Sequence, residues 1–314
     1  MRHLVTTSIV VVVVVGGVGA IVAGSRSLNE AGRIQPDTRT VHVSVADRNG
    51  SGIVDLQAAE LEVKVGGKTQ QVISARQAVV PLRIAIIVSD AGTGAFQQAV
   101  GNFMQKLLGH AEFRLVSVIV QPETVVDYSS SAGVLREGLL RLGARGRQRG
   151  AQLMETIQQV TKDVRREGTR PVIVVLRVGA EATTTIPGDQ VREQLQKSGA
   201  ILYVVSTVGA QRAAPSQARP GISNEQAQLR ADEDTDAAFE LGKVLGDGTR
   251  ESGGRHEQII STTLVPALEQ IAADLLNQYE VTFVRPTGGK PGDKLSVSSK
   301  RKGITIRAPS RLPI

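Results

Sequence analysis

The side chains that could carry out chemistry in this sequence are carboxylates and arginines. Asp90 follows a long apolar run and Glu155 lies near the start of an amphipathic segment, so the two could act as an acid/base pair if the fold brought them together. Arg177 follows a second apolar run. Three more arginines share one short segment, Arg145, Arg147 and Arg149. Because a guanidinium can bind a carboxylate through two parallel hydrogen bonds, these arginines favour recognition of an acidic group.

Other kinds of chemical site are not indicated. The chain has no cysteine, which removes disulfides, thiolate metal sites and cysteine nucleophiles. There is no Gly-x-Ser-x-Gly nucleophile elbow and no Gly-x-x-x-x-Gly-Lys-Ser/Thr phosphate loop, and Gly92 and Gly94 lack the third glycine of a dinucleotide fingerprint. The four histidines have no metal-binding spacing; they are His3, His42, His110 and His256. We therefore predict a protein that is not an enzyme and has no cofactor and no metal.

The composition is that of a globular, basic chain. With 314 residues, of which 41% are hydrophobic, it can bury one large core or two smaller ones. The 37 Lys and Arg against 30 Asp and Glu give a net charge of +7, which favours contact with acidic surfaces. Proteins that bind nucleic acid usually interleave stacking aromatics with basic residues, whereas this chain is 3% aromatic and has no Trp. We predict a protein partner, of acidic character, and no nucleic acid.

The N-terminus indicates export. A short basic start precedes an apolar stretch at residues 4–23, and the small residues Ala20, Ala23, Gly24 and Ser25 offer a cleavage site. A stretch of about 20 apolar residues is also long enough to span a bilayer. We predict that residues 1–24 are a signal peptide or an N-terminal membrane anchor and that residues 25–38 are a linker. The protein is then periplasmic, extracellular or anchored to the inner membrane.

From residue 39 onward the chain shows two structural patterns: half-buried strands towards both ends, and buried strands that alternate with helices between them. Half-buried strands with turn residues between them are predicted at 40–45, 61–65, 69–74, 279–284, 294–298 and 304–307. Buried strands are predicted at 82–88, 113–120, 172–176 and 201–206, and amphipathic helices at 96–108, 133–142, 153–166, 190–197 and 264–275. This alternation predicts an α/β fold with a doubly wound, mostly parallel sheet.

The two groups of half-buried strands are predicted to form one smaller module. Two short hairpins cannot bury enough surface to be stable separately, so we expect residues 39–78 and 279–312 to build a single β-sandwich-like module. The α/β domain, residues 80–278, is then inserted in this module or adjoins it. Within it, the polar segment 210–235 is predicted to be a surface insertion, and the acidic run at 232–236 favours the start of a helix.

The segment 82–90, Leu-Arg-Ile-Ala-Ile-Ile-Val-Ser-Asp, resembles the first strand of a von Willebrand factor type A domain, which ends in the Asp that opens the metal-ion-dependent adhesion site. The flanking β segments resemble a module found beside this domain in a bacterial, largely acidobacterial group of related proteins. They are residues 41–47, the glycine turn at 66–68, and 252–255, 278–283 and 300–304. Together these cover most of residues 39–312, and their order carries the resemblance. It implies a Rossmann-like α/β domain that binds a partner at the carboxyl ends of its strands.

The resemblance also implies that the metal site is degenerate. In the family, Asp-x-Ser-x-Ser, a Thr from a second loop and an Asp from a third hold a hard cation such as Mg²⁺. Here the first motif is Asp90-Ala91-Gly92-Thr93-Gly94, which lacks both serines. The Thr position aligns with Ala151 and the later Asp position with Val178. Only Asp90 remains, and one carboxylate is too few for a metal site of useful affinity.

We therefore predict that fixed positive charge replaces the ion as the receptor for an acidic partner. The candidate partner-binding residues are Asp90, Thr93, Arg145, Arg147, Arg149 and Arg177. In an alternative interpretation the loop arginines are only solvated and Arg177 pairs with Asp90. The predicted function is that of a metal-independent protein-binding or scaffolding module of the bacterial cell envelope. Two alternatives stay open: an α/β enzyme that uses Asp90 and Glu155, and a membrane-tethered structural protein.

Overall fold

The computed structural model describes residues 37–144, 152–179, 184–207, 235–285, 288, 290 and 292–312. Residues 37–314 form one compact unit. The predicted signal or anchor at residues 1–24, nearly all of the insertion at 210–235 and the three arginines at 145, 147 and 149 lie outside the described residues. No helix within the described ranges is long and apolar enough to cross a membrane.

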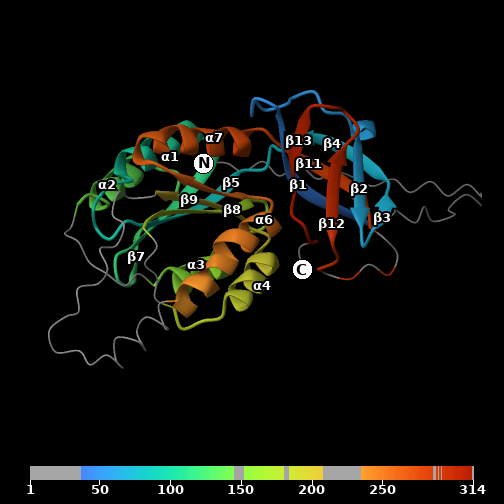
Figure 1. Ribbon diagram of the computed structural model, residues 1–314. Coiled ribbons are helices and arrows are strands. Elements are labelled where there is room, and N and C mark those ends of the chain that lie inside the picture. The colour runs from blue at the N-terminus through green and yellow to red at the C-terminus, as the bar shows by residue number, and fades with distance from the viewer. Residues whose placement is uncertain are drawn as a thin grey trace, which may run out of the picture. The chain divides into compact units, whose positions relative to one another are not determined.

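A six-stranded sheet lies at the centre of the α/β part (Figure 1), in the order β10-β9-β8-β5-β6-β7. Five strands are parallel, and the edge strand β7 is antiparallel to β6. The strands are β5 (Leu82–Ser89), β6 (Ala111–Val118), β7 (Pro122–Ser129), β8 (Arg170–Val178), β9 (Ile201–Thr207) and β10 (Arg255–Ile259). This topology confirms the predicted fold class.

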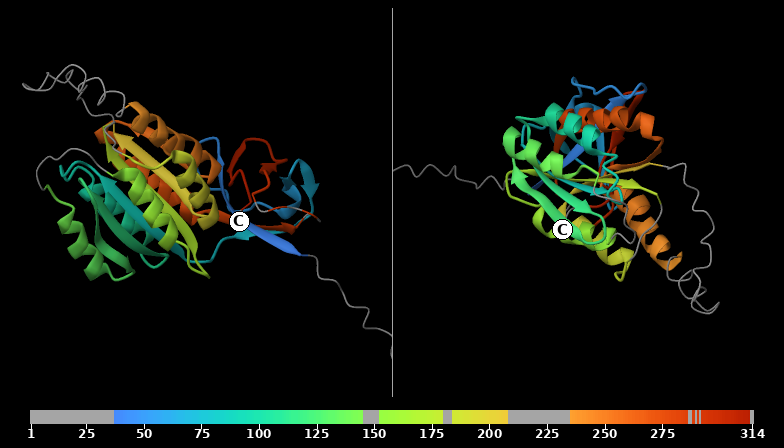
Figure 2. Two further views of the ribbon diagram at one scale, coloured as in Figure 1. Left: turned by 90° about the horizontal axis from the view of Figure 1, so that it is seen from below. Right: turned by 90° about the vertical axis from the view of Figure 1, so that its left-hand side faces the viewer.

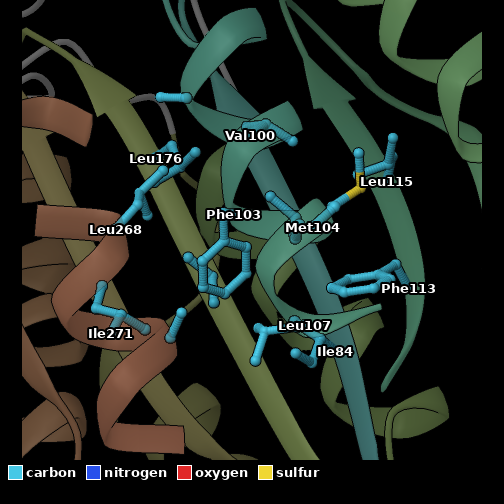
Figure 3. Close-up of a cluster of buried hydrophobic side chains, with 14 of the residues drawn as sticks. Ile84, Val100, Phe103, Met104, Leu107, Phe113, Leu115, Leu176, Leu268 and Ile271 are labelled. Carbon is cyan, nitrogen blue, oxygen red and sulfur yellow. The ribbon is translucent and has the colours of Figure 1, made fainter. Parts of the chain in front are cut away.

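Helices cover both faces of this sheet (Figures 1 and 2), which is why its central strands are apolar on both sides. Helices α1 (Gln97–Leu107) and α7 (Leu264–Leu276) pack on one face, where Phe103, Leu268 and Ile271 lie against Ile84 and Leu176 (Figure 3). The other face packs against α3 (Leu153–Asp163) and α4 (Gly188–Ser198). Helix α2 (Ala132–Arg141) packs beside β7.

Two strands of the α/β part were missed by the sequence prediction, and one helix was indicated only by its start. Strand β7 is one of them, and β10 is the other, a short run of mostly polar residues without an apolar stretch to mark it. Residues 235–242 are helical, as the acidic run at 232–236 suggested, and the helix continues as η2 (Lys243–Gly248), a π-helical stretch, and α6 (Thr249–Glu251).

The β module consists of two antiparallel sheets, with strand orders β13-β1-β11-β4 and β12-β2-β3. Its elements are β1 (Thr38–Asp47), η1 (Ala58–Glu60), β2 (Leu61–Val65), β3 (Lys68–Gln70), β4 (Val72–Gln77), β11 (Gln278–Val284), β12 (Leu295–Ser299) and β13 (Ile304–Arg307), and the short η3 (Ser261–Thr263) precedes α7. The expected pairing between the two ends of the chain is confirmed, because β1 pairs with β11 and β13, and β2 pairs with β12. The exact domain boundaries stay a prediction.

Two details of this module differ from the expectation. The strand predicted at 69–74 divides at Gln71, so that β3 stays beside β2 while β4 joins β11 in the other sheet. Strands β12 and β13 flank the basic turn at 300–303 as predicted, but they pair with β2 and β1 in different sheets. Apolar side chains between the sheets explain both differences, since Val43, Val63 and Phe283 are fully buried there.

Arg170 joins the segments that lead into and out of the α/β part. It begins β8 and is only 5% exposed. Its Nε donates to the Val80 carbonyl (2.7 Å), and its Nη1 donates to the Leu275 carbonyl (3.1 Å) and to Gln278 Oε1 (2.8 Å). One buried guanidinium therefore connects the segment that precedes β5 with the last turn of α7 and the start of β11.

Candidate functional site

The loop after β5 binds the Asp90 carboxylate with its own backbone. Asp90 is 3% exposed, and its oxygens accept hydrogen bonds from the backbone N–H of Gly92 (2.9 Å) and of Gly94 (2.6 Å). The Thr93 hydroxyl lies 3.5 Å from Oδ2. The chain makes this turn through left-handed backbone at Ala91, Gly92 and Gly94, with φ values of 55°, 79° and 74°, a region that glycine enters without steric penalty. Asp90 thus stabilises the loop that carries it.

The residues at this edge do not fit the divalent ion that the family resemblance implies. Gly92 and Gly94 stand at the two serine positions and offer no side-chain oxygen. A Cβ built on Gly94 would lie 2.7 Å from the Ala144 backbone nitrogen, so a serine there would displace the neighbouring loop. Val178 ends β8, and Ala151 lies outside the described residues. Within the described ranges no three His, Asp or Glu side chains are grouped so as to hold a metal ion.

Arg177 lies inside β8, because this strand continues to Val178 beyond its predicted end at 176. The residue is 8% exposed, and its Nη2 is buried with no hydrogen-bond partner among the residues that the structure describes. Burial lowers the pKa of its guanidinium. Among the described residues no carboxylate forms an ion pair with Arg177, Asp90 included. A charged donor therefore lies near the carboxyl ends of the strands with part of its hydrogen-bonding capacity unused.

Sequence reasoning missed the polar residues that flank Arg177. In the register of the sheet, Ser89 of β5 and Ser206 of β9 stand on either side of it, on the same face. The Ser206 hydroxyl lies 2.9 Å from His256 Nε2, on the next strand. Burial, and then the charge of Arg177, lower the pKa of His256. The sequence did contain a signal for the two serines, because β5, β8 and β9 each have a polar residue near the end of an apolar run. It contained no such signal for His256.

Glu155, the second carboxylate of the enzymatic alternative, stabilises a different loop. Its Oε1 accepts hydrogen bonds from the Thr184 hydroxyl (3.0 Å) and from the Thr185 backbone N–H (2.9 Å). Its Oε2 is buried and has no hydrogen-bond partner in the part of the chain that the structure describes. In the part of the chain that the structure describes, no hydrogen bond connects Glu155 with Asp90. The two carboxylates are held by separate loops, so these contacts do not assemble an acid/base pair.

Strand order and connections define the class of this protein: a doubly wound, mostly parallel α/β sheet combined with a smaller β module. No protein-family model matches the sequence, and a comparison with curated proteins gave no match. Among solved structures, the chain is similar to a von Willebrand factor type A protein from Catenulispora acidiphila, with 11% identity over 88% of this chain and 74% of that one and a TM-score of 0.41.

Two further solved structures are similar to this chain. The conserved hypothetical protein BatB from Bacteroides thetaiotaomicron has 11% identity over 62% of this chain and 97% of its own, with a TM-score of 0.39. The pilus adhesin SpaC from Lactobacillus rhamnosus GG has 9% identity over 81% of this chain, with a TM-score of 0.42. The chain spans about half of that adhesin structure, 48% of its length.

Proposed function

We propose that this protein is an exported, non-enzymatic binding module of the von Willebrand factor A type that recognises an acidic group of a protein partner without a metal ion. The observation that carries this proposal is Arg177, a buried guanidinium at the carboxyl edge of the sheet whose Nη2 has no hydrogen-bond partner in the described part of the chain. Burying a charge is unfavourable unless it is paired. A carboxylate from a partner would supply the missing acceptor.

The position of Arg177 supports this proposal independently of its hydrogen bonds. In open α/β sheets, ligands bind outside the carboxyl ends of the strands, and Arg177 is the penultimate residue of the central strand β8. The Asp90 carboxylate accepts hydrogen bonds from the backbone of its own loop and forms no ion pair with Arg177 among the described residues, so it does not occupy the guanidinium. Arg145, Arg147 and Arg149 follow α2 in the sequence and are proposed to extend the same basic surface.

Metal independence is tested by calorimetry. We expect titration of the folded protein with Mg²⁺ or Ca²⁺ to show no specific site at the Asp90 edge. The reason is that Asp90 is the one residue that matches a ligand position of the family's metal site. Its carboxylate already accepts hydrogen bonds from the backbone N–H groups of Gly92 and Gly94. A single site of micromolar affinity that Asp90→Ala abolishes would contradict this part of the proposal.

The arginine receptor is tested by capture of the partner from the native envelope, with mass spectrometry to identify it and salt titrations to measure binding. Arg177→Met should weaken binding by roughly tenfold or more, because hydrogen bonds to charged groups contribute about 1.5–3 kcal/mol each. Arg147→Glu and Arg149→Glu should slow association and flatten its salt dependence. Arg165→Glu is the matched control, since Arg165 is exposed near the C-terminal end of α3 and binds the Lys197 carbonyl there. Unchanged binding in all three test variants would remove the receptor from this edge.

Export and the fate of residues 1–24 are tested separately. The mass of the protein isolated from the envelope should show either loss of the first residues, if the segment is a signal peptide, or their retention in a membrane fraction, if it is an anchor. A full-length chain recovered from the cytosol would contradict the proposed export.

A further inference from the structure

A histidine lies beside the row of polar residues at the carboxyl end of the sheet. In the register of the parallel strands, Ser89, Arg177 and Ser206 stand in one row across β5, β8 and β9. Strand β10 follows β9 in the sheet order, and its His256 places Nε2 2.9 Å from the Ser206 hydroxyl. Because neighbouring strands are about 4.8 Å apart, Ser206 lies between the Arg177 side chain and the His256 ring.

These four side chains share one face of the sheet. Side chains two positions apart on a strand point to the same side. The residues two positions before Ser89, Arg177 and Ser206 belong to the core that packs against α3 and α4; they are Ile87, Val175 and Val204. His256 is opposite Val204 in the register and so lies on this face too. Ser206 is half-buried and more exposed than Arg177, so its hydroxyl is within reach of a group that binds the guanidinium.

The role of the Ser206 hydroxyl depends on the protonation of His256. A neutral imidazole has one N–H and one nitrogen that accepts, whereas the protonated ring donates from both nitrogens. When the neutral ring carries its proton on Nδ1, Nε2 accepts the Ser206 proton, and the hydroxyl presents lone pairs toward Arg177. Once Nε2 is protonated, it donates to Ser206 Oγ, and the hydroxyl proton can point toward a group bound at Arg177. One proton therefore changes Ser206 from an acceptor into a donor on that side.

Electrostatics couple the same two sites. After burial, the charge of Arg177 is the cause that lowers the pKa of His256. Among the described residues, the other charged groups of β10 and of the elements packed against it are paired with one another. The pairs are Lys243 with Glu240, Arg250 with Asp247, Arg192 with Glu251, Arg255 with Glu257 and Asp274, and Arg307 with Asp274. A carboxylate bound at Arg177 would offset the charge of Arg177 and raise the pKa of His256 again.

We propose that His256 is a positioning residue of the Arg177 receptor: its protonation turns Ser206 into a second donor for the bound carboxylate, so that an acidic group binds more tightly as the pH falls. This inference rests on the proposed function, because it concerns the same receptor. The class of ligand is a carboxylate that stays ionised while His256 titrates. Carboxyl groups of Asp and Glu meet this condition, since they lose their charge only near pH 4.

The direction of the pH effect follows from linkage. A bound carboxylate favours the protonated ring, so the occupied receptor takes up the proton at a higher pH than the empty one. Between these two pH values, binding of the acid is accompanied by uptake of a proton. Affinity for the acid must therefore increase as the pH falls through this window, and it levels off once the empty receptor is also protonated.

The probe for this coupling is acetate, a single carboxylate. Its binding to the full chain is measured by NMR at pH 7.5 and at pH 5.5, from saturation transfer to the acetate methyl group, with chloride holding the ionic strength constant. The wild type should bind acetate at least roughly threefold more tightly at pH 5.5, which corresponds to a pKa difference of about half a unit. Saturating acetate should also move the titration of the His256 ring to higher pH.

Four variants divide the effect into its parts. His256→Gln should bind acetate equally at the two pH values, because glutamine does not titrate. Ser206→Ala should show a smaller difference between the two pH values than the wild type. His110→Gln is the matched control, since His110 is exposed in the turn before β6, and it should keep the full pH dependence. Arg177→Met should not bind acetate at either pH, which separates the receptor from adsorption elsewhere. Circular dichroism checks that each variant folds.

Several results would overturn the inference and leave the proposed function standing. They are Arg177-dependent binding of acetate that is equal at the two pH values, and a pH dependence in His256→Gln or Ser206→Ala as large as in the wild type. Ring ¹⁵N shifts that place the proton of neutral His256 on Nε2 would also overturn it, because Ser206 could then donate to the receptor at every pH. Acetate binding that is absent up to roughly 100 mM, or that Arg177→Met does not reduce, would instead count against the receptor itself and therefore against both proposals.

Discussion

Arg170 and Arg177 lie on the same strand, seven positions apart, and are both buried, with 5% and 8% exposure. Arg170 donates to two backbone carbonyls and a glutamine oxygen, whereas Nη2 of Arg177 has no hydrogen-bond partner within the described ranges. Burial lowers the pKa of both guanidinium groups, that of Arg170 to about 10. The difference is therefore in hydrogen bonding rather than in burial. A buried charge with internal acceptors holds the fold together, and one that lacks an acceptor is a candidate for binding.

The largest expected effect comes from removal of the Arg170 guanidinium. Arg170→Met should reduce the free energy of unfolding by about 3–5 kcal/mol, since several buried acceptors lose their donor and each unsatisfied group costs about 1–3 kcal/mol. Part of this loss is offset because the buried charge is also removed. Urea denaturation followed by circular dichroism measures the change. If Arg170→Met and Arg177→Met were equally stable, the contrast between the two arginines would be lost.

The second prediction concerns His42, which the charge of Arg170 influences. Burial, and then Arg170, lower the pKa of His42 from 6.5 to about 4, opposed by Glu280, and His42 Nε2 has no hydrogen-bond partner among the described residues. Below pH 6.5 the unfolded chain takes up a proton that the folded protein does not bind until about pH 4. Stability must therefore fall as the pH decreases through this window, by about 2–3 kcal/mol for a shift of this size.

Urea denaturation at pH 7 and at pH 4.5 measures this effect. His42→Gln serves as the comparison because glutamine does not titrate. The wild type should lose more stability than the variant between these pH values, by about 2 kcal/mol. Carboxylates that titrate in the same range contribute to both proteins and cancel in the difference. An identical loss in the two proteins would show that His42 is protonated as readily when folded as when unfolded.

The fold could be predicted from the sequence wherever a buried strand is a continuous run of apolar residues. Residues 172–176 are buried on both faces and were recognised as a strand, as were residues 82–88. Strand β10 was missed because an edge strand of five residues needs few apolar side chains, and Arg255 and Glu257 instead bind each other at 2.7 Å. The division of the strand at Gln71 was missed because the choice between two sheets depends on packing of residues distant in the sequence.

The site was predicted less completely than the fold. The sequence identified Arg177 and Asp90 as neighbours of the sheet edge, but not that the Asp90 oxygens would face the N–H groups of Gly92 and Gly94. That arrangement depends on left-handed backbone, which the glycines permit but do not specify. The contact between Ser206 and His256 depends on β10 lying next to β9. Strand order is a property of the whole fold, so no local pattern contained this pair.

The smallest expected effect on stability, and the sharpest test of the comparison, is that of Arg177→Met. Methionine removes a desolvated charge and fills much of the same volume, so the free energy of unfolding should stay within about 1 kcal/mol of the wild type or rise slightly. The same change should raise the pKa of His256, because the charge of Arg177 is one of the two causes that lower it. An NMR titration of the histidine ring measures that shift, which a purely structural side chain far from His256 would not produce. A destabilisation as large as that of Arg170→Met would mean that Arg177 holds the fold together, and the sheet edge would then have no unused donor to offer a partner.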